Sequence, residues 1–300
     1  MISVSALVQH VDTLATAAGK SVADTAVAAA QSGESSGGNW ILEHVTDSHV
    51  LEFQPFGEIH LPQFPPVHLL GLTIDFSLTK HIVMIWFACL LLIVFVRYAV
   101  RGYKRSNIPH GLANALETIV IFVRDDIVYE AIGEKGRPLL PYFITLFFFV
   151  LFSNLVGLIP YTSTPTGNVN VTASLAIISF FVIQISGMVH NGFFGYFKGL
   201  MPSHIPIFVI PVMAIVEILG LFTKPFALCI RLFANMSAGH IVIFSLIGLI
   251  FIFQSVLIAP ISVAFAVFIC LLEILVGLIQ AYIFTLLTAL FVGLAVHQEH

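Results

Sequence analysis

The chain has 300 residues, of which 58% are hydrophobic and only 9% are charged, and its formal net charge is −4. Soluble globular domains carry about 25% charged residues, so this composition excludes a soluble protein and predicts an integral membrane protein. The apolar runs are continuous and do not alternate, which excludes a transmembrane barrel and predicts an all-α polytopic fold. At about 20 residues per span, five or six membrane helices fit in this length.

Residues 1–74 are predicted to form an N-terminal extension and an extracytoplasmic loop, partly disordered or processed. The first 40 or so are rich in Ala, Ser, Val and Gly, and three interpretations stay open for them: a short amphipathic helix, a flexible tail or a removable leader. Residues 40–71 are polar and include Pro62, Pro65 and Pro66, which favours a loop outside the bilayer.

Residues 75–300 are predicted to form the integral membrane domain, with five spans and one helix at the membrane surface. In chain order these elements are expected at 80–100, 112–132 (the surface helix), 138–160, 175–189, and as two long helices within 205–296 that separate near 254–260. Each of the last two exceeds the usual span length, so they are expected to form a long tilted hairpin.

Cationic residues gather on one side of the expected spans. They are Arg97, Arg101, Lys104, Arg105, Arg124, Lys135, Arg137 and Lys198. Loops rich in Lys and Arg stay in the cytoplasm, which predicts an outer N-terminal region and a cytoplasmic C-terminus.

Five polar side chains interrupt one of the two long apolar helices. At about 100° per residue, Glu217, Lys224, Arg231 and Asn235 fall within a sector of about 60°, whereas His240 faces about 180° away from Arg231. A charge at bilayer depth costs from about 2.5 to over 10 kcal/mol, so such residues usually pair or line a path. The pattern predicts a protein that moves an ion through the membrane, with the arginine at the centre.

Four segments carry a resemblance to a known family. They are RLFANMSAGH, VEILGLFTKPFALCIRLF, NVNVTASLA and QAYIFTLLTALF. Together they resemble subunit a of the F-type ATP synthases, over about residues 75–300. The resemblance implies that this region is a proton-channel domain, in which two offset half-channels carry protons to and from a rotating c-ring.

The resemblance also implies partners and a location. The partners are the c-ring subunits, peripheral-stalk b subunits and the lipid bilayer, with no nucleic acid. The location is an energy-transducing membrane, taken as the bacterial inner membrane with the mitochondrial inner membrane as the alternative. The sequence holds no phosphate-binding glycine loop, HExxH or CxxC motif. We therefore expect no cofactor, no metal and no catalysis by this chain alone, with ATP chemistry in other subunits.

Residue by residue, Arg231 matches the family's essential arginine, Asn235 the polar residue one turn on, and Gln280 the glutamine that faces the arginine. The two amides either orient the arginine and hold water or form plain helix–helix hydrogen bonds. His240 and Glu273 match a pair of family positions that hold one acid and one imidazole. Many bacterial members carry the carboxylate first and the histidine second, whereas here the order is exchanged, as in mitochondrial members. Which of the two titrates near neutral pH stays open, as does the choice between H⁺ and Na⁺.

The chemistry of Arg231 favours a barrier over a carrier. A guanidinium stays charged at physiological pH and cannot relay a proton. It repels a proton and attracts a carboxylate on a passing helix, which favours release of the carboxylate's proton. The alternative is an arginine that snorkels to the interface, which the apolar sequence on both sides disfavours.

The titratable candidates are Glu217, His240 and Glu273, which can take up and release protons as a relay requires. His240 and Glu273 are expected on the outer path, with a structural pair that locks the long helices as the alternative. Glu217 is expected on the cytoplasmic path with Lys224, with a static ion pair across two helical turns as the alternative.

Two other functions fit parts of the pattern. An independent secondary ion-coupled transporter predicts internal repeats and matching broken helices, and neither is evident in the sequence. An intramembrane metal-dependent hydrolase that uses His240 and Glu273 needs a third ligand and a general base.

Overall fold

The computed structural model describes residues 50–53, 57–62, 67–69, 72–74, 77, 79–101, 111–159, 164–199, 210–253 and 259–297. Five of its helical segments are long and apolar enough to cross a membrane. They are Lys80–Arg101, Leu112–Gly157, Val169–Asn191, Ile215–Ile250 and Ala259–Val296. The prediction of an all-α polytopic membrane protein is confirmed for the part of the chain that follows residue 79.

Two small β-hairpins precede the first span, in the segment for which the sequence predicted a loop. Strand β1 (Val50–Phe53) pairs antiparallel with β2 (Gly57–His60), and β3 (Val67–Leu69) pairs antiparallel with β4 (Leu72–Ile74). Short runs that contain Val, Leu, Ile and Phe favour strands, and these runs lie between the polar residues and prolines of this segment. The interpretations of residues 1–40 lie outside the described residues.

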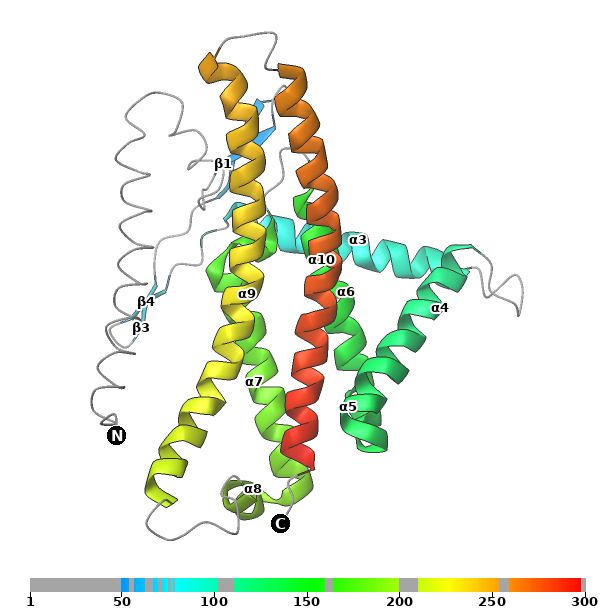
Figure 1. The fold of residues 1–300 in the computed structure, drawn as a ribbon, viewed down its shortest axis with the longest axis vertical. Coiled ribbons are helices and arrows are strands. Elements are labelled where there is room, and N and C mark those ends of the chain that lie inside the picture. Colours follow the sequence, from blue (N-terminus) through cyan, green and yellow to red (C-terminus); the bar gives the residue numbers. More distant parts are fainter. Residues whose placement is uncertain are drawn as a thin grey trace, which may run out of the picture.

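The first span, α3, is Lys80–Arg101, as predicted. The chain then continues through α4 (Leu112–Phe122), the π-helical η2 (Val123–Tyr129), α5 (Glu130–Ile132), the 3₁₀-helical η3 (Gly133–Leu139) and α6 (Leu140–Gly157). Figure 1 shows α4 and α6 as the two arms of a helical hairpin that turns at α5.

The helix expected at the membrane surface packs one face on protein. Its predicted apolar face is present, because Leu116, Val123 and Ile127 are all buried. They belong to one core cluster with residues of α6 and of the last helix, α10 (Ala259–Val296). An amphipathic pattern indicates that one face of the helix is buried, but it does not indicate whether lipid or another helix covers that face.

The turn after α6 holds the short 3₁₀ helix η4 (Pro165–Gly167), followed by α7 (Val169–Asn191) and α8 (Phe193–Gly199). Helix α7 begins six residues earlier than residue 175, where the sequence analysis placed the third span. Asn168 caps it by accepting a hydrogen bond of 2.8 Å from the backbone N–H of Asn170. Helix α8 lies between the span predicted at 175–189 and the long helices predicted from residue 205.

Helices α9 (Ile210–Phe253) and α10 are 44 and 38 residues long. At 1.5 Å per residue they measure about 66 and 57 Å, roughly twice the 30 Å hydrocarbon core of a bilayer. They lie side by side as an antiparallel hairpin in Figure 1, with α3 running across them and α6 and α7 behind. Helices of this length lie oblique to the membrane normal or extend beyond the hydrocarbon core.

Helix α10 is the central helix of the fold, since it packs against α9, α6, α7 and α5. At its C-terminal end Gly293 permits a close approach, because a Cβ there would clash with the carbonyl oxygen of Ala131. One turn later, His297 Nε2 lies 2.8 Å from the carbonyl oxygen of Ile132. These contacts fix the position of α10 along its own axis, and with it the position of the polar residues that α10 carries.

Candidate proton-transfer site

A buried contact between a histidine and a glutamate joins the two long helices. His240 of α9 and Glu273 of α10 contact each other through Nδ1 and Oε1, which are 2.6 Å apart. The side chain of His240 is 14% exposed and that of Glu273 only 4%. The pair that the family resemblance predicted is therefore formed, and it is screened from solvent on both sides.

Close helix packing makes this contact possible. Gly239 precedes the histidine, and a Cβ at this position would lie 2.8 Å from Glu273 Oε1. The second carboxyl oxygen of Glu273, Oε2, is buried and has no hydrogen-bond partner among the residues that the structure describes. A buried polar atom without a protein partner is costly, so Oε2 is the oxygen of this pair that is free to accept a further hydrogen bond.

The other imidazole nitrogen of His240 faces the end of α6. Nε2 lies 2.9 Å from the main-chain carbonyl oxygen of Gly157 and 2.6 Å from Oγ1 of Thr164. Thr164 is itself buried, 3% exposed, just before η4. The histidine therefore connects three segments of the chain: α10 through one nitrogen, and α6 and the η4 turn through the other.

A second polar network lies beside the first. Asn154 of α6 donates a hydrogen bond of 3.0 Å to the carbonyl oxygen of Gly277, one turn after Glu273 on α10. Its own amide oxygen accepts a bond of 2.6 Å from Thr166 Oγ1. Asn154 and Thr166 are at most 1% exposed, so this network fixes the register of α10 against α6 next to the histidine–glutamate contact.

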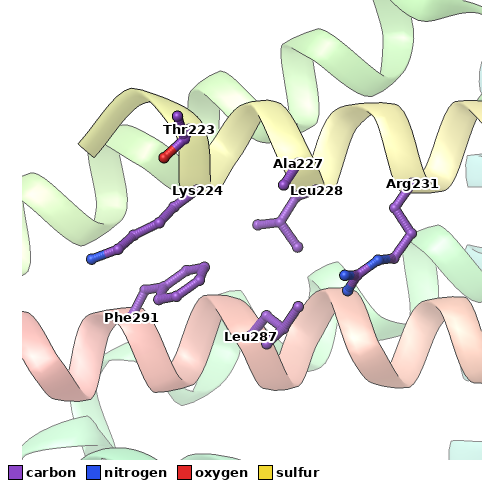
Figure 2. A pocket seen from close by; sticks show the side chains of 7 residues that line it. All are labelled: Thr223, Lys224, Ala227, Leu228, Arg231, Leu287 and Phe291. Carbon is purple, nitrogen blue, oxygen red and sulfur yellow. The ribbon is translucent and has the colours of Figure 1, made fainter. Parts of the chain in front are cut away.

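Arg231 lies in a groove of about 360 Å³ between α9 and α10. Figure 2 shows its guanidinium pointing from α9 toward α10 beside Leu287, with Lys224 extended over the ring of Phe291 in the same groove. The Lys224 ammonium is 5.2 Å from the centre of that ring. Arg231 is exposed and has no salt bridge or hydrogen bond within the described part of the chain, so its charge is available to a partner.

Arg231 and His240 lie on opposite flanks of α9. Nine residues separate them, which is about 13 Å along the helix and about 180° around it. The face between them carries Leu228, Leu232 and Met236, which are at most 2% exposed. A packed apolar strip therefore separates the arginine groove from the buried His240–Glu273 pair.

The remaining candidate residues occupy separate positions. Glu217 is half-buried and Asn235 exposed, both on α9, while Gln280 is buried on α10. Among the described residues Glu217 forms no ion pair with Lys224, and Gln280 forms no hydrogen bond with Arg231. The roles expected of these residues stay predictions.

The family-level comparison spans this whole arrangement. A family model described as ATP synthase A chain matches residues 82–293, from the first turn of α3 to the last turn of α10. The chain belongs to the ATP synthase subunit a family.

Three bacterial relatives are each named ATP synthase subunit a. That of Chloroherpeton thalassium is 49% identical over 263 residues, which cover 86% of this chain and 77% of the relative. That of Pelodictyon phaeoclathratiforme is 46% identical over 286 residues, covering 93% and 83% respectively. That of Myxococcus xanthus is 47% identical over 229 residues, covering 76% and 75%. The similarity to the ATP synthase subunit a family thus extends over most of the chain.

Four residues of the site were not predicted from the sequence. Thr164 and the Gly157 carbonyl contact His240, and Asn154 and Thr166 tie α6 to α10. One signal was available for Asn154, because an amide inside an apolar span is costly and usually has a partner. A main-chain carbonyl leaves no such signal in a sequence.

Proposed function

We propose that this chain is the proton-translocating stator subunit of an F-type ATP synthase. In this proposal residues 75–300 form the proton-channel domain and residues 1–74 an extracytoplasmic extension. Two offset half-channels deliver protons to a c-ring carboxylate and receive them from it, and the resulting rotation drives ATP synthesis. The chain itself carries out no catalysis. The observation that carries the proposal is the separation of the buried His240–Glu273 pair from the Arg231 groove by a packed strip of α9.

The outer half-channel ends, in this proposal, at His240 and Glu273. Both side chains exchange protons, and a buried pair 2.6 Å apart shares a proton without a large movement. The neighbouring groups are a hydroxyl, a carbonyl and an amide, which supply hydrogen-bond partners for water. A proton that reaches this pair passes to the c-ring carboxylate.

Arg231 is the divider between the half-channels. Its fixed positive charge repels a proton and stabilises the ionised form of a carboxylate that approaches it. A c-ring carboxylate that arrives protonated therefore releases its proton before it passes. The free guanidinium and the open groove support this role, since a partnered arginine has less charge to offer.

The inner half-channel leaves the groove toward Glu217. In this proposal Glu217 takes the released proton, Lys224 keeps that carboxylate ionised between transfers, and Asn235 and Gln280 orient Arg231 and hold water. Helix α9 diverges from α10 toward its N-terminal end (Figure 1), and Pro225 lies in that part. The groove that Thr223, Lys224 and Arg231 line supports a path in this direction.

The proposed surroundings follow from the family. The partners are the c-ring, the peripheral-stalk b subunits and lipid, in a bacterial inner membrane. The N-terminal region lies outside and the C-terminus in the cytoplasm. Each proton that crosses 100 mV releases about 2.3 kcal/mol, so several must cross for each ATP formed.

The experiment is coupled ATP synthesis by inverted membrane vesicles that contain the whole complex. Arg231→Ala is expected to abolish synthesis, while the ATP hydrolysis activity that stays bound to the vesicles remains at the wild-type level and serves as the assembly control. Synthesis at the wild-type rate in Arg231→Ala vesicles would overturn the proposed function.

A further inference from the structure

The imidazole of His240 has different kinds of neighbours at its two nitrogens. Nδ1 faces a carboxyl oxygen of Glu273 at 2.6 Å. Nε2 faces the Gly157 carbonyl oxygen at 2.9 Å and the Thr164 hydroxyl at 2.6 Å. A carboxyl group can donate or accept a hydrogen bond, whereas a carbonyl can only accept. The two sides of the ring are therefore not equivalent.

The carbonyl determines the tautomer. If Nε2 carried no hydrogen, its lone pair would face the Gly157 oxygen, and that oxygen would lose its donor. With the hydrogen on Nε2, the imidazole donates toward Gly157 and toward Oγ1 of Thr164, and Nδ1 is left as an acceptor aimed at Glu273.

We propose that Thr164 and the Gly157 carbonyl are positioning groups that hold a hydrogen on Nε2 of His240, so that proton exchange runs through the Glu273 carboxyl and not through the imidazole ring. The inference rests on the proposed function and adds to it the order of atoms on the outer path. Thr164 acts through His240, and no contact of its own with the translocated proton is needed.

The proton balance is simple. In the neutral pair, Glu273 carries a proton on Oε1 and donates it to Nδ1, while Nε2–H donates to Gly157. When that proton moves from Oε1 to Nδ1, a carboxylate and an imidazolium result, and the pair still holds two protons. Nε2 keeps its hydrogen in both states, so the ring neither flips nor passes a proton across itself.

The second oxygen of Glu273 then connects the pair to its surroundings. Oε2 is buried and has no partner among the described residues, so it can receive the next proton while Oε1 engages His240. The titratable groups near the imidazole are Glu273 on α10 and, one turn earlier, Cys270, which interacts electrostatically with Glu273. The neighbours from α6, from the η4 turn and from α9 itself are an uncharged carbonyl, the hydroxyl of Thr164 and the ring of Phe244.

The role of the hydroxyl is tested by ATP synthesis in vesicles that carry the whole complex. Thr164→Val keeps the side-chain volume and removes the hydroxyl, whereas Thr164→Ser keeps the hydroxyl and removes a methyl group. We expect Val to lower the synthesis rate by about 3- to 10-fold, the effect of one lost hydrogen bond, and Ser to retain most of the rate. Thr288→Val is the matched control, because Thr288 is buried on α10 and bonds only the carbonyl of its own helix.

The pH profile is the readout that a packing role would not move. The hydroxyl accepts a hydrogen bond from Nε2–H and so favours the imidazolium. The rate of ATP synthesis is measured against the pH on the side to which the outer half-channel opens. Loss of the hydroxyl is expected to move the alkaline limb of this profile toward lower pH, by about 0.5 to 1 unit. If Thr164→Val blocks assembly, Thr164→Ala removes the same hydroxyl without adding a methyl group.

An unshifted profile, or a serine variant as impaired as the valine variant, would overturn the inference. Arg231→Ala, assayed in the same way, distinguishes failure of the positioning role from failure of the proposed function. Inactive Arg231→Ala with normal Thr164→Val refutes only the positioning role, whereas active Arg231→Ala refutes the proposed function itself.

Discussion

Gly239→Ala is expected to disable the proposed outer path without replacing any titratable group. The new Cβ would lie 2.8 Å from Glu273 Oε1 and 3.0 Å from its Cδ, whereas ordinary contacts begin at 3.4 Å. The carboxyl oxygen must therefore move by about 0.6 Å. Glu273 is only 4% exposed, so its side chain has little free space into which to move.

The displacement acts on the contact with His240. If Glu273 Oε1 moves directly away from His240 Nδ1, their separation grows from 2.6 Å to about 3.2 Å, the outer limit of a hydrogen bond. A hydrogen bond to a charged group is worth about 1.5 to 3 kcal/mol, which corresponds to a factor of about 10 to 150. We expect a fall of at least 10-fold in the rate of ATP synthesis by vesicles.

The control is Gly220→Ala on the same helix. A Cβ at Gly220 would meet no atom within 4 Å, and alanine is the better helix former. We expect this variant to synthesise ATP at the wild-type rate. Equal rates for Gly239→Ala and Gly220→Ala would refute the claim that helix contact at Gly239 sets the geometry of the pair.

Two further predictions concern the packing around the site. Asn154→Leu removes two buried hydrogen bonds and leaves the Thr166 hydroxyl without its acceptor, so we expect a loss of about 1 to 3 kcal/mol, measured as a lower Tm of the purified complex than that of the Thr288→Val variant. An unchanged Tm would contradict the role of this network. Phe291→Leu removes the ring beneath the Lys224 ammonium, a contact worth about 0.5 to 1 kcal/mol at an exposed site, so ATP synthesis is expected to fall by less than about 5-fold. A complete loss would show that the aromatic ring is essential.

The long spans were predictable because their apolar runs are longer than anything a soluble core needs. The first span was placed from residue 80, where α3 begins, and the break near residues 254–260 separates α9 from α10. The helix at 112–132 was found, but its burial against α6 and α10 was not, since lipid and protein bury the same kind of face. The β-hairpins before α3 were missed, because strands of three or four residues give little periodic signal.

The candidate site was predictable where residue types alone carry chemistry. The contact between His240 and Glu273 was expected from the family and is present. The part played by Thr164 was hidden, because a threonine in a turn is ordinary and only the fold brings it to the imidazole. Gln280 was expected to face Arg231, and its role stays a prediction, because a long side chain such as that of Arg231 loses much rotamer freedom in any single contact and its sequence does not specify one partner.

The central claim is that Arg231 divides the two half-channels and carries no proton itself. The direct measurement is proton flux into liposomes that hold only the membrane sector, driven by an imposed potential, with wild-type and Arg231→Ala preparations side by side. A divider, once removed, lets a protonated ring carboxylate pass between the two paths, so we expect Arg231→Ala to conduct protons while its coupled ATP synthesis is lost. Loss of proton flux together with synthesis would contradict the account and make the arginine part of the conducting path.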